Sequence, residues 1–409
     1  MRDFFPETMR LRERIFDAWR TAAGRFGFEP YDAPVVESLE LLTRKAGEEI
    51  VNQIYAFKDK SGRDLALRPE MTPSLARMVA SRQSALSFPL RWATIAQCFR
   101  YERTTRGRKR EHYQWNLDII GEASVAAEAE VLACAAEALK LLGLQPSDIV
   151  IRYSSRKLLA ALFEQAGIPP DCHPATFLAL DKRGKISDER MLEILQCGGL
   201  TDDQISRVMG LMEVSSIADI TGRLPEDNPA WQEIAQFEQL IDAYGLASCV
   251  AFDISVVRGL SYYTGIVFEC FDAAREFRAI FGGGRYDNLL RDVGGEPQTG
   301  VGLGFGDVVV AEVLQASHAA RDPAAPTTVA VGFMSEEQRL PAIRFAADLR
   351  SHAQDVLLSL TPEKAKAFFS RSAKANARSA AYIGPDDVEQ GQVRVKQLDT
   401  RDEHLMPLP

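Results

Sequence analysis

The chain has 409 residues and a formal net charge of −9, and 46% of its residues are hydrophobic. A chain of this length is expected to form two or three domains, with ample apolar residues to build their cores. No apolar run is long enough to cross a bilayer, and the acidic balance argues against general coating of nucleic acid.

The N-terminal part is predicted to begin with a helix over residues 7–26. Residues 27–34 follow this helix, and residues 36–145 alternate helical and strand patterns. Within that region Glu70 stands next to Pro69, just before apolar residues at helical spacing. Taken alone, this pattern indicates a carboxylate at the start of a helix.

A pair of predicted strands carries polar residues at every second position, on either side of a basic loop: Arg100 and Glu102 before it, Gln114, Asn116 and Asp118 after it. On a strand this spacing places each set on one face. The alternate positions are apolar and are expected to pack into a core: Phe99, Tyr101, Tyr113, Trp115, Leu117 and Ile119. The pattern predicts an antiparallel hairpin whose polar face lines a site, because buried polar groups are costly without partners.

The loop between these strands concentrates positive charge: Arg103, Arg106, Arg108, Lys109 and Arg110. On an acidic chain, such a patch suits the binding of phosphate groups. A solvated loop tip is the alternative for a basic run considered alone. The polar faces next to the loop favour the phosphate site.

The middle of the chain separates the hairpin from a second group of site candidates. Residues 168–229 are acidic and helical in pattern, contain no residue that is catalytic by type, and predict an inserted helical domain; a purely structural insertion is the alternative. Residues 262–269 predict a strand with Tyr263 and Glu269 on one face. Three glycines at 282–284 do not fit a Rossmann or P-loop pattern, and we expect their backbone to lie close to substrate or to a neighbouring strand.

The C-terminal part is predicted to be a separate small domain. Residues 317–326 have the composition of a linker. The remaining elements alternate between strand and helix: strands at 329–333, 356–360, near 380 and near 393, and helices ending near 352 and covering 362–377. This alternation predicts a parallel or mixed α/β domain.

Several motifs together resemble those of class II aminoacyl-tRNA synthetases, and within that class the histidyl-tRNA synthetase family. Residues 99–118 are similar to motif 2 of the class, and residues 258–265, Arg-Gly-Leu-Ser-Tyr-Tyr-Thr-Gly, are similar to the histidine-specific signature. Residues 2–7, 67–72 and 282–287 extend the resemblance over nearly the whole chain. The motif 2 loop is most similar to that of the branch found in plant organelles and some bacteria.

The resemblance implies an α+β fold, with a class II antiparallel sheet flanked by helices. It implies a catalytic domain over residues 1–320 with a helical insertion over about 168–229, which in the family touches the tRNA acceptor arm. Residues 327–409 would form an α/β domain like the anticodon-binding domain of these enzymes. Residues 27–34 resemble motif 1, which forms the dimer interface in the class, so a homodimer is expected.

The implied reaction joins histidine to ATP, giving histidyl-adenylate and pyrophosphate, and then moves the histidyl group to the 3′ end of tRNA-His. Two anions meet in the first step, so cationic side chains are needed to offset their repulsion. By resemblance the nucleotide is bound by Arg100 at the α-phosphate, Glu102 beneath the adenine and Arg108 at the distal phosphates. Arg258 would bridge the α-phosphate and the histidine carboxylate. Mg²⁺ would accompany ATP, and we assign it no protein site.

Histidine presents an ammonium group and an imidazole ring. By resemblance the ammonium is bound by Glu70, Thr72 and Gln114, the ring by Asp118 and Tyr263, with Tyr262 and Tyr286 completing the pocket. A buried site built around a ring N–H rejects side chains that lack one, because its own polar groups would be left unpaired.

Three positions depart from the family pattern. Ser261 replaces the usual Asp of the signature, and Asp118 stands where many relatives carry Glu. In motif 3, residues 302–309 place Val309 where the class has an arginine that contacts the terminal phosphate of ATP. The sequence therefore names no partner for that phosphate other than Arg108.

Two proteins that do not charge tRNA are alternatives. One is the histidyl-synthetase-like regulatory subunit of histidine biosynthesis, which generally lacks the C-terminal domain and would not need a basic motif 2 loop. The other is a tRNA sensor normally attached to a kinase, and no kinase pattern occurs here. The absence of the motif 3 arginine is the strongest argument for either.

Cysteine usage and the N-terminus bear on the compartment. The six cysteines are scattered and form no Cys-x-x-Cys pair, which argues against a zinc site and for reduced thiols. Residues 1–7 lack the basic and apolar regions of a signal peptide and do not resemble a transit peptide. We therefore expect a cytoplasmic protein with no membrane partner.

Overall fold

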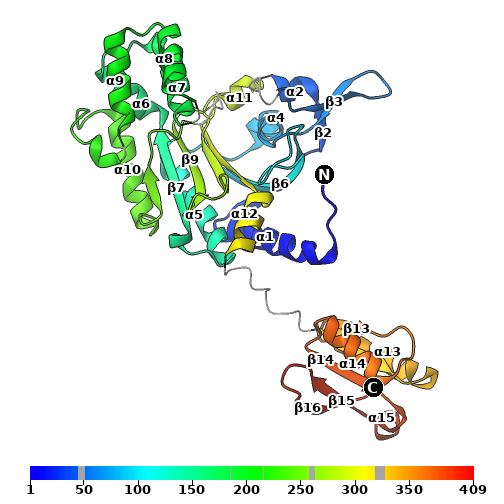
Figure 1. Cartoon of the computed structure of the whole chain (residues 1–409). Helices are drawn as coiled ribbons and strands as arrows, with labels where there is room; N and C mark the ends of the chain where they lie inside the picture. The colour runs from blue at the N-terminus through cyan, green and yellow to red at the C-terminus, as the bar shows by residue number, and fades with distance from the viewer. Residues whose placement is uncertain (45–50, 185, 215, 258–262, 318–327) are drawn as a thin grey trace. The chain divides into compact units, whose positions relative to one another are not determined.

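The computed structural model describes the chain except for residues 45–50, 185, 215, 258–262 and 318–327 (Figure 1). The chain forms two compact units, Met1–Ala320 and Arg321–Pro409. No helix in the described part is both long and apolar enough to cross a membrane.

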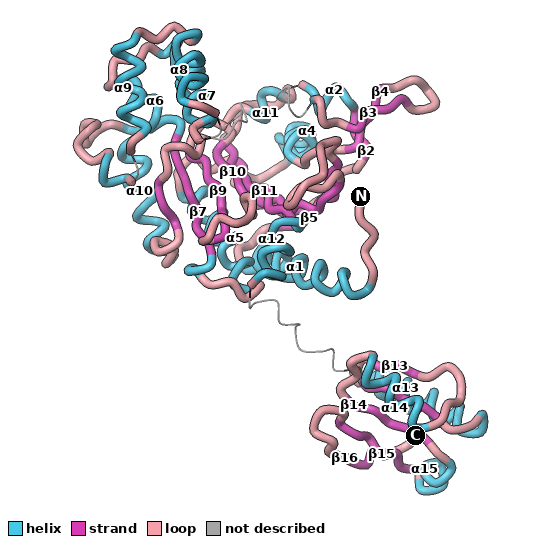
Figure 2. Tube along the Cα trace, viewed as in Figure 1, coloured by secondary structure: helices cyan, strands magenta, loops and turns pink. Residues whose placement is uncertain are grey.

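The first unit is built on an eight-stranded sheet whose order is β1-β5-β6-β11-β10-β9-β7-β8 (Figure 2). Neighbouring strands from β5 to β7 are antiparallel, and the edge pairs β1–β5 and β7–β8 are parallel. The strands are β1 (Glu29–Pro30), β5 (Leu90–Phe99), β6 (Glu111–Ile120), β7 (Ile149–Ser155), β8 (Val250–Phe252), β9 (Ile266–Asp272), β10 (Phe281–Arg285) and β11 (Gly300–Gly306). The predicted antiparallel sheet flanked by helices is confirmed.

One face of this sheet is covered by helices α1 (Pro6–Arg25), α5 (Ala126–Leu141) and α12 (Asp307–Ala316) (Figure 1). Trp19 of α1 packs on Trp115 of β6, with ring centroids 5.8 Å apart. Leu117 and Ile119 lie in the same buried core, so the period-two pattern of β6 does bury its apolar side. The polar residues of β6 therefore face the opposite side of the sheet.

Helices α4 (Thr72–Arg82) and α11 (Leu289–Asp292) belong to smaller apolar clusters that involve the other side of the sheet. Val79 of α4 packs in a cluster with Ile120 of β6, and Ala76 packs in another with Val267 of β9. Nearby, β2 (Val36–Ser38), β4 (Asp64–Leu67) and β3 (Tyr55–Lys58) form a separate antiparallel sheet, with α2 (Leu39–Thr43) after β2.

The hairpin prediction is confirmed for β5 and β6, which pair in register from Leu90 opposite Ile120 to Phe99 opposite Glu111. One detail is wrong: Tyr101 does not pack into the core and is 55% exposed. Strand β5 ends at Phe99, so the alternation of faces ends before Tyr101. Its ring lies instead against the guanidinium of Arg110, 4.5 Å from the ring centroid.

The predicted strand over 262–269 begins later than expected, at Ile266, and its residue 262 lies outside the described residues. The three glycines lie in β10, between β9 and β11. A Cβ on Gly283 would lie 2.1 Å from the Gly302 carbonyl oxygen. The expectation that this backbone lies close to a neighbouring strand is therefore confirmed. A residue with a side chain would not fit at this contact.

The predicted helical segment contains α7 (His173–Lys182), α8 (Asp188–Cys197) and α9 (Asp202–Met212), flanked by α6 (Arg156–Gln165) and α10 (Pro229–Ala243). Hydroxyl caps start two of these helices, since Ser187 and Thr201 accept bonds from the third backbone N–H of α8 and α9. Leu195 and Val208 are buried in a core that is continuous with the core of the sheet.

A buried ion pair joins α5 to β10. Arg285 is 1% exposed and donates to both carboxylate oxygens of Glu128, at 2.7 and 2.6 Å. The guanidinium also donates to the carbonyl oxygens of Glu122 and Ser124. Every charge in this pair is met by an opposite charge or a hydrogen bond, as burial requires.

The second unit is a five-stranded mixed sheet of order β13-β12-β14-β15-β16, with its own apolar cores. Strand β12 is parallel to β13 and β14, and β14–β15 and β15–β16 are antiparallel, which confirms the predicted parallel or mixed α/β pattern. Its elements are β12 (Val329–Phe333), α13 (Arg339–Ser351), β13 (Val356–Leu358), α14 (Ala365–Lys374), β14 (Ser379–Ile383), α15 (Pro385–Gln390), β15 (Gln392–Gln397) and β16 (Glu403–Pro407).

Candidate active site

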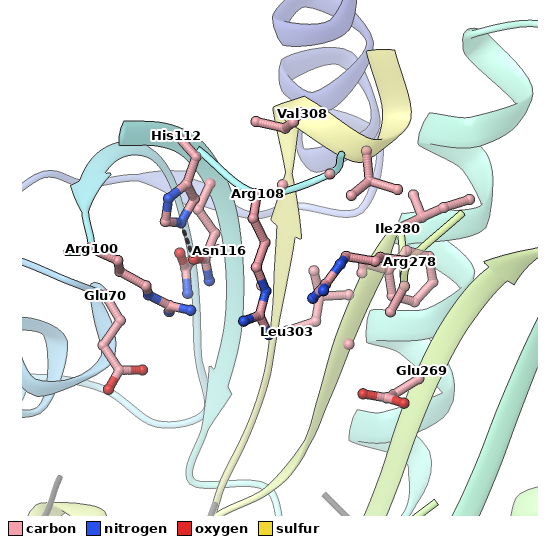
Figure 3. A pocket seen from close by; sticks show the side chains of 18 of the residues that line it. Glu70, Arg100, Arg108, His112, Asn116, Glu269, Arg278, Ile280, Leu303 and Val308 are labelled. Atoms are coloured by element: carbon pink, nitrogen blue, oxygen red, sulfur yellow. Dashed lines mark hydrogen bonds between the residues drawn. The ribbon is translucent and has the colours of Figure 1, made fainter. Parts of the chain in front are cut away.

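A cavity of about 660 Å³ lies over the polar side of the central sheet in the first unit (Figure 3). Nine of the predicted site residues line it: Glu70, Thr72, Arg100, Glu102, Arg108, Gln114, Asp118, Tyr263 and Tyr286. They come from the start of α4, the hairpin, and the segments around β9 and β10. The two other predicted residues, Arg258 and Tyr262, lie outside the described residues.

The floor of the cavity is a strand of alternating glycines. In β11 the residues between the glycines, such as Phe305, point into the core. A Cβ on Gly302 would lie 2.1 Å from Asp118 Oδ1, and one on Gly304 would lie 1.9 Å from Gln114 Nε2. The absence of a side chain at Gly302 and at Gly304 therefore makes the space in which Asp118 and Gln114 lie.

Asp118 is 2% exposed, and the Tyr286 hydroxyl donates to its Oδ1. Its Oδ2 is buried and has no hydrogen-bond partner among the described residues. Burial raises the pKa of Asp118 to about 7, and the bond from Tyr286 acts in the opposite direction. A buried acceptor without a partner is costly, so this oxygen is suited to an N–H donated by a ligand.

The arginines of the hairpin are held in different ways. Arg100 follows the end of β5, and its Nε donates to the Pro69 carbonyl oxygen at 3.0 Å. This bond fixes the guanidinium, which Figure 3 shows beside Glu70 at the cavity wall. Arg108 pairs with Glu102 through Nη1 and Oε2 at 2.9 Å. Both guanidinium groups can donate two hydrogen bonds to a phosphate.

His112 is a cavity residue that the motif analysis missed. It lies two positions before Gln114 on β6, and its Nε2 is 3.4 Å from Gln114 Oε1. Burial, with the charge of Arg100 as a second cause, lowers the pKa of His112 to about 4, so the ring is neutral at pH 7. The period-two pattern of the strand, extended by one step, would have found it.

Other lining residues carried no motif signal. Asp181 lines the cavity from α7, so the helical insertion, in which we expected no catalytic type, contributes a carboxylate to the wall. Arg278 lines it from the connection between β9 and β10, and Gln53 and Ser255 from loops. Their positions depend on how distant segments meet, which local patterns do not report.

The segment that replaces motif 3 has two structural roles. Val309 of α12 is apolar and lines the cavity. Asp307, at the start of the same helix, accepts from the Tyr113 N–H at 2.9 Å and from Arg2 Nη2 at 3.0 Å. Burial raises the pKa of Asp307, against the lowering effect of Arg2. Arg2 also pairs with Glu111 at 2.7 Å, so the N-terminus is tied to β6 and α12.

Metal ligands and thiols add little to this site. Across the part of the chain that the structure describes, no cluster of three or more histidine, cysteine or acidic side chains is arranged to hold a metal ion. All six cysteines are free thiols, and burial raises the pKa of Cys98 to about 12. Cys98 is therefore a protonated, unreactive core residue at neutral pH.

Comparison with known proteins identifies the family. A sequence model described as histidyl-tRNA synthetase matches residues 1–306. The chloroplastic and mitochondrial histidine–tRNA ligase of Arabidopsis thaliana is 40% identical over 407 residues, which cover 100% of this chain and 84% of that protein. The plant relative supports the resemblance of the motif 2 loop to the organellar branch.

Two crystal structures share the fold. Histidyl-tRNA synthetase from Nostoc sp. PCC 7120 has a TM-score of 0.84 at 24% identity, covering 99% of this chain and 95% of that one. A protein from Bacillus halodurans C, described as an ATP phosphoribosyltransferase regulatory subunit/histidyl-tRNA synthetase, has a TM-score of 0.77 at 24% identity, covering 94% and 97%. With a family match over most of its length and a relative that is similar from end to end, this chain belongs to the histidyl-tRNA synthetase family.

Proposed function

We propose that the cavity in Met1–Ala320 activates histidine with ATP and transfers it to tRNA-His, so that the chain acts as a histidine–tRNA ligase. One observation carries this proposal: the same cavity holds the guanidinium groups of Arg100 and Arg108 and the buried, unpartnered oxygen of Asp118. Phosphates suit the arginines, and a ring N–H suits the carboxylate.

In the activation step the histidine carboxylate attacks the α-phosphate of ATP. Arg100 would donate to that phosphate, with its orientation fixed by the bond to Pro69. Arg108 would leave Glu102 to bind the distal phosphates, which frees Glu102 to lie beneath the adenine. Arg258 would bridge the two reacting anions, as the resemblance implies.

Recognition of histidine follows from the buried carboxylate. Asp118 Oδ2 would accept the imidazole N–H while Tyr286 holds Oδ1. Glu70, Thr72 and Gln114 would bind the ammonium group, with Tyr262 and Tyr263 against the ring. An amino acid without a ring N–H would leave Asp118 buried and unsatisfied, which supports selectivity.

The remaining assignments concern partners and assembly. Mg²⁺ would bind to the phosphates of ATP and neutralise part of their charge, and we assign it no protein site. The unit Arg321–Pro409 would bind the anticodon, and the helical insertion would bind the acceptor arm of the tRNA.

We also propose a cytoplasmic homodimer. Light scattering should then give twice the chain mass of 45.3 kDa.

The test is histidine-dependent ATP–pyrophosphate exchange by the purified protein without tRNA. Exchange with histidine, and not with other amino acids, followed by charging of tRNA-His, would support the ligase. The alternative, a regulatory subunit that senses histidine, is favoured only by Val309 in place of the motif 3 arginine. Histidine binding by calorimetry without any exchange would establish that alternative.

A further inference from the structure

The apolar Val309 leaves one end of the proposed nucleotide site without its usual cation. The side chain is 7% exposed, lines the cavity and has no hydrogen-bond donor. Arg108 would then be the one residue that the resemblance assigns to the distal phosphates of ATP, whose charge is large and grows on pyrophosphate as it leaves.

A second arginine reaches the same place from another part of the chain. Arg278 lies between β9 and β10 and lines the cavity. A Cβ on Gly107 would lie 3.1 Å from Arg278 Cδ and 3.5 Å from Val309 Cγ2. Gly107 of the motif 2 loop therefore lies next to the side chains of both Arg278 and Val309.

The direction and pairing of Arg278 suit an anion. In Figure 3 the guanidinium groups of Arg108 and Arg278 point into the same part of the cavity. Arg108 is paired with Glu102, whereas Arg278 has no hydrogen bond or ion pair among the residues that the structure describes. A guanidinium that lines a cavity with its donors unused can bind two phosphate oxygens at once.

An ordinary surface arginine is the competing explanation, and the same connection contains one. Both arginines are exposed, but Arg275 does not line the cavity and lies over the ring of Phe271, 4.8 Å from its centroid. Three residues apart in sequence, the two arginines thus differ in the feature that matters, which is access to the cavity.

We propose that Arg278 binds the terminal phosphates of ATP and takes the place of the arginine that is missing at Val309. The proposal rests on the proposed function. As a histidine carboxylate oxygen forms its bond to the α-phosphorus, the bond from that phosphorus to the bridging oxygen of the β-phosphate breaks. The electron pair leaves with pyrophosphate, whose added negative charge Arg278 would stabilise together with Arg108.

The test compares Arg278→Gln with Arg275→Gln, a matched removal of charge from the same connection. In ATP–pyrophosphate exchange, Arg278→Gln should lower kcat/KM for ATP on the order of 10²-fold, and Arg275→Gln less than about twofold. Pyrophosphate inhibition should weaken in Arg278→Gln, while affinity for AMP and for histidine stays unchanged, because neither carries the distal phosphates. Unchanged binding of AMP and histidine also shows that the variant is folded.

A double variant provides a rescue experiment. The double variant Arg278→Gln, Val309→Arg restores an arginine at the motif 3 position, where the class has one. Recovery of about tenfold in kcat/KM for ATP, relative to Arg278→Gln alone, would support the assignment. Equal kcat/KM for Arg278→Gln and Arg275→Gln, with an active wild type, would overturn it and leave the ligase function intact. An equal loss of AMP and ATP affinity would also overturn it, since that pattern indicates a structural role. A wild type without exchange would count against the ligase itself.

Discussion

At the scale of single residues, Asp118 determines how the site responds to pH. Its pKa is about 7 in the folded chain, against an ordinary value of 3.8. Between these two values the folded state holds a proton that the unfolded state has lost. The free energy of unfolding therefore falls as pH rises through this window, by about 4 kcal/mol at most.

We accordingly expect Asp118→Asn to stabilise the ligand-free protein at pH 8 and to have little effect near pH 4, where the folded wild type and the folded variant both carry an uncharged side chain at this position. Histidine affinity should fall at least tenfold in the same variant, because an amide presents an N–H donor or a weaker acceptor to the ring. Thermal unfolding at both pH values and calorimetric titration with histidine measure the two effects. A stability gain that is equal at pH 4 and pH 8 would show that the titration of Asp118 is not its cause.

Arg258 lies outside the described residues, so its prediction comes from the resemblance alone. Arg258→Ala should lower the rate of adenylate formation by 10²-fold or more, since bridging two anions matters most in the transition state. Histidine binding should change much less. Single-turnover adenylate formation and equilibrium binding separate the two quantities. A loss confined to histidine affinity, with turnover preserved, would contradict the bridging role.

At the scale of elements, the glycines of strand β11 control the shape of the site because they place no side chain in the cavity. Gly304→Ala would place a methyl group against the side-chain amide of Gln114, 1.9 Å from Nε2, and should raise KM for histidine by about tenfold or more. Gly306→Ala is the control on the same strand, because no atom lies within 4 Å of a Cβ built there. Exchange kinetics with varied histidine measure the difference, and similar KM values for the two variants would refute this role of the strand.

At the scale of the whole molecule, the two units have separate cores, so each is expected to fold without the other. A chain that ends at Ala320 should keep ATP–pyrophosphate exchange within about threefold of wild type and lose most tRNA charging, because the activation site lies in the first unit alone. Parallel losses of exchange and charging in the truncated chain would contradict anticodon binding by Arg321–Pro409.

The sequence predicted the hairpin and its polar face because period-two spacing within one strand is a local property. Gln114, Asn116 and Asp118 were identified in this way, and all three line the cavity. Tyr101 was misplaced because the strand ends two residues earlier than the pattern suggests.

Other features could not be predicted because they depend on contacts between distant segments. The pairing of β11 with β6, which places Gly302 opposite Asp118, joins segments far apart in the chain. Arg278 and Asp181 reach the cavity only through the fold of the sheet and the helical insertion. The spacing of residues within one segment does not predict contacts between distant segments.

The ion pair between Glu128 and Arg285 has a consequence for how sequences in this family can diverge. Removing either partner would leave a fully buried charge and cost about 3–5 kcal/mol, whereas replacing both with apolar residues of similar volume can be nearly neutral. The two substitutions are thus tolerable together, but the single variant that must precede the double variant would be close to the limit of folding stability. Lineages should either retain both residues or have exchanged them jointly, and homologues that carry only one of the two should be rare.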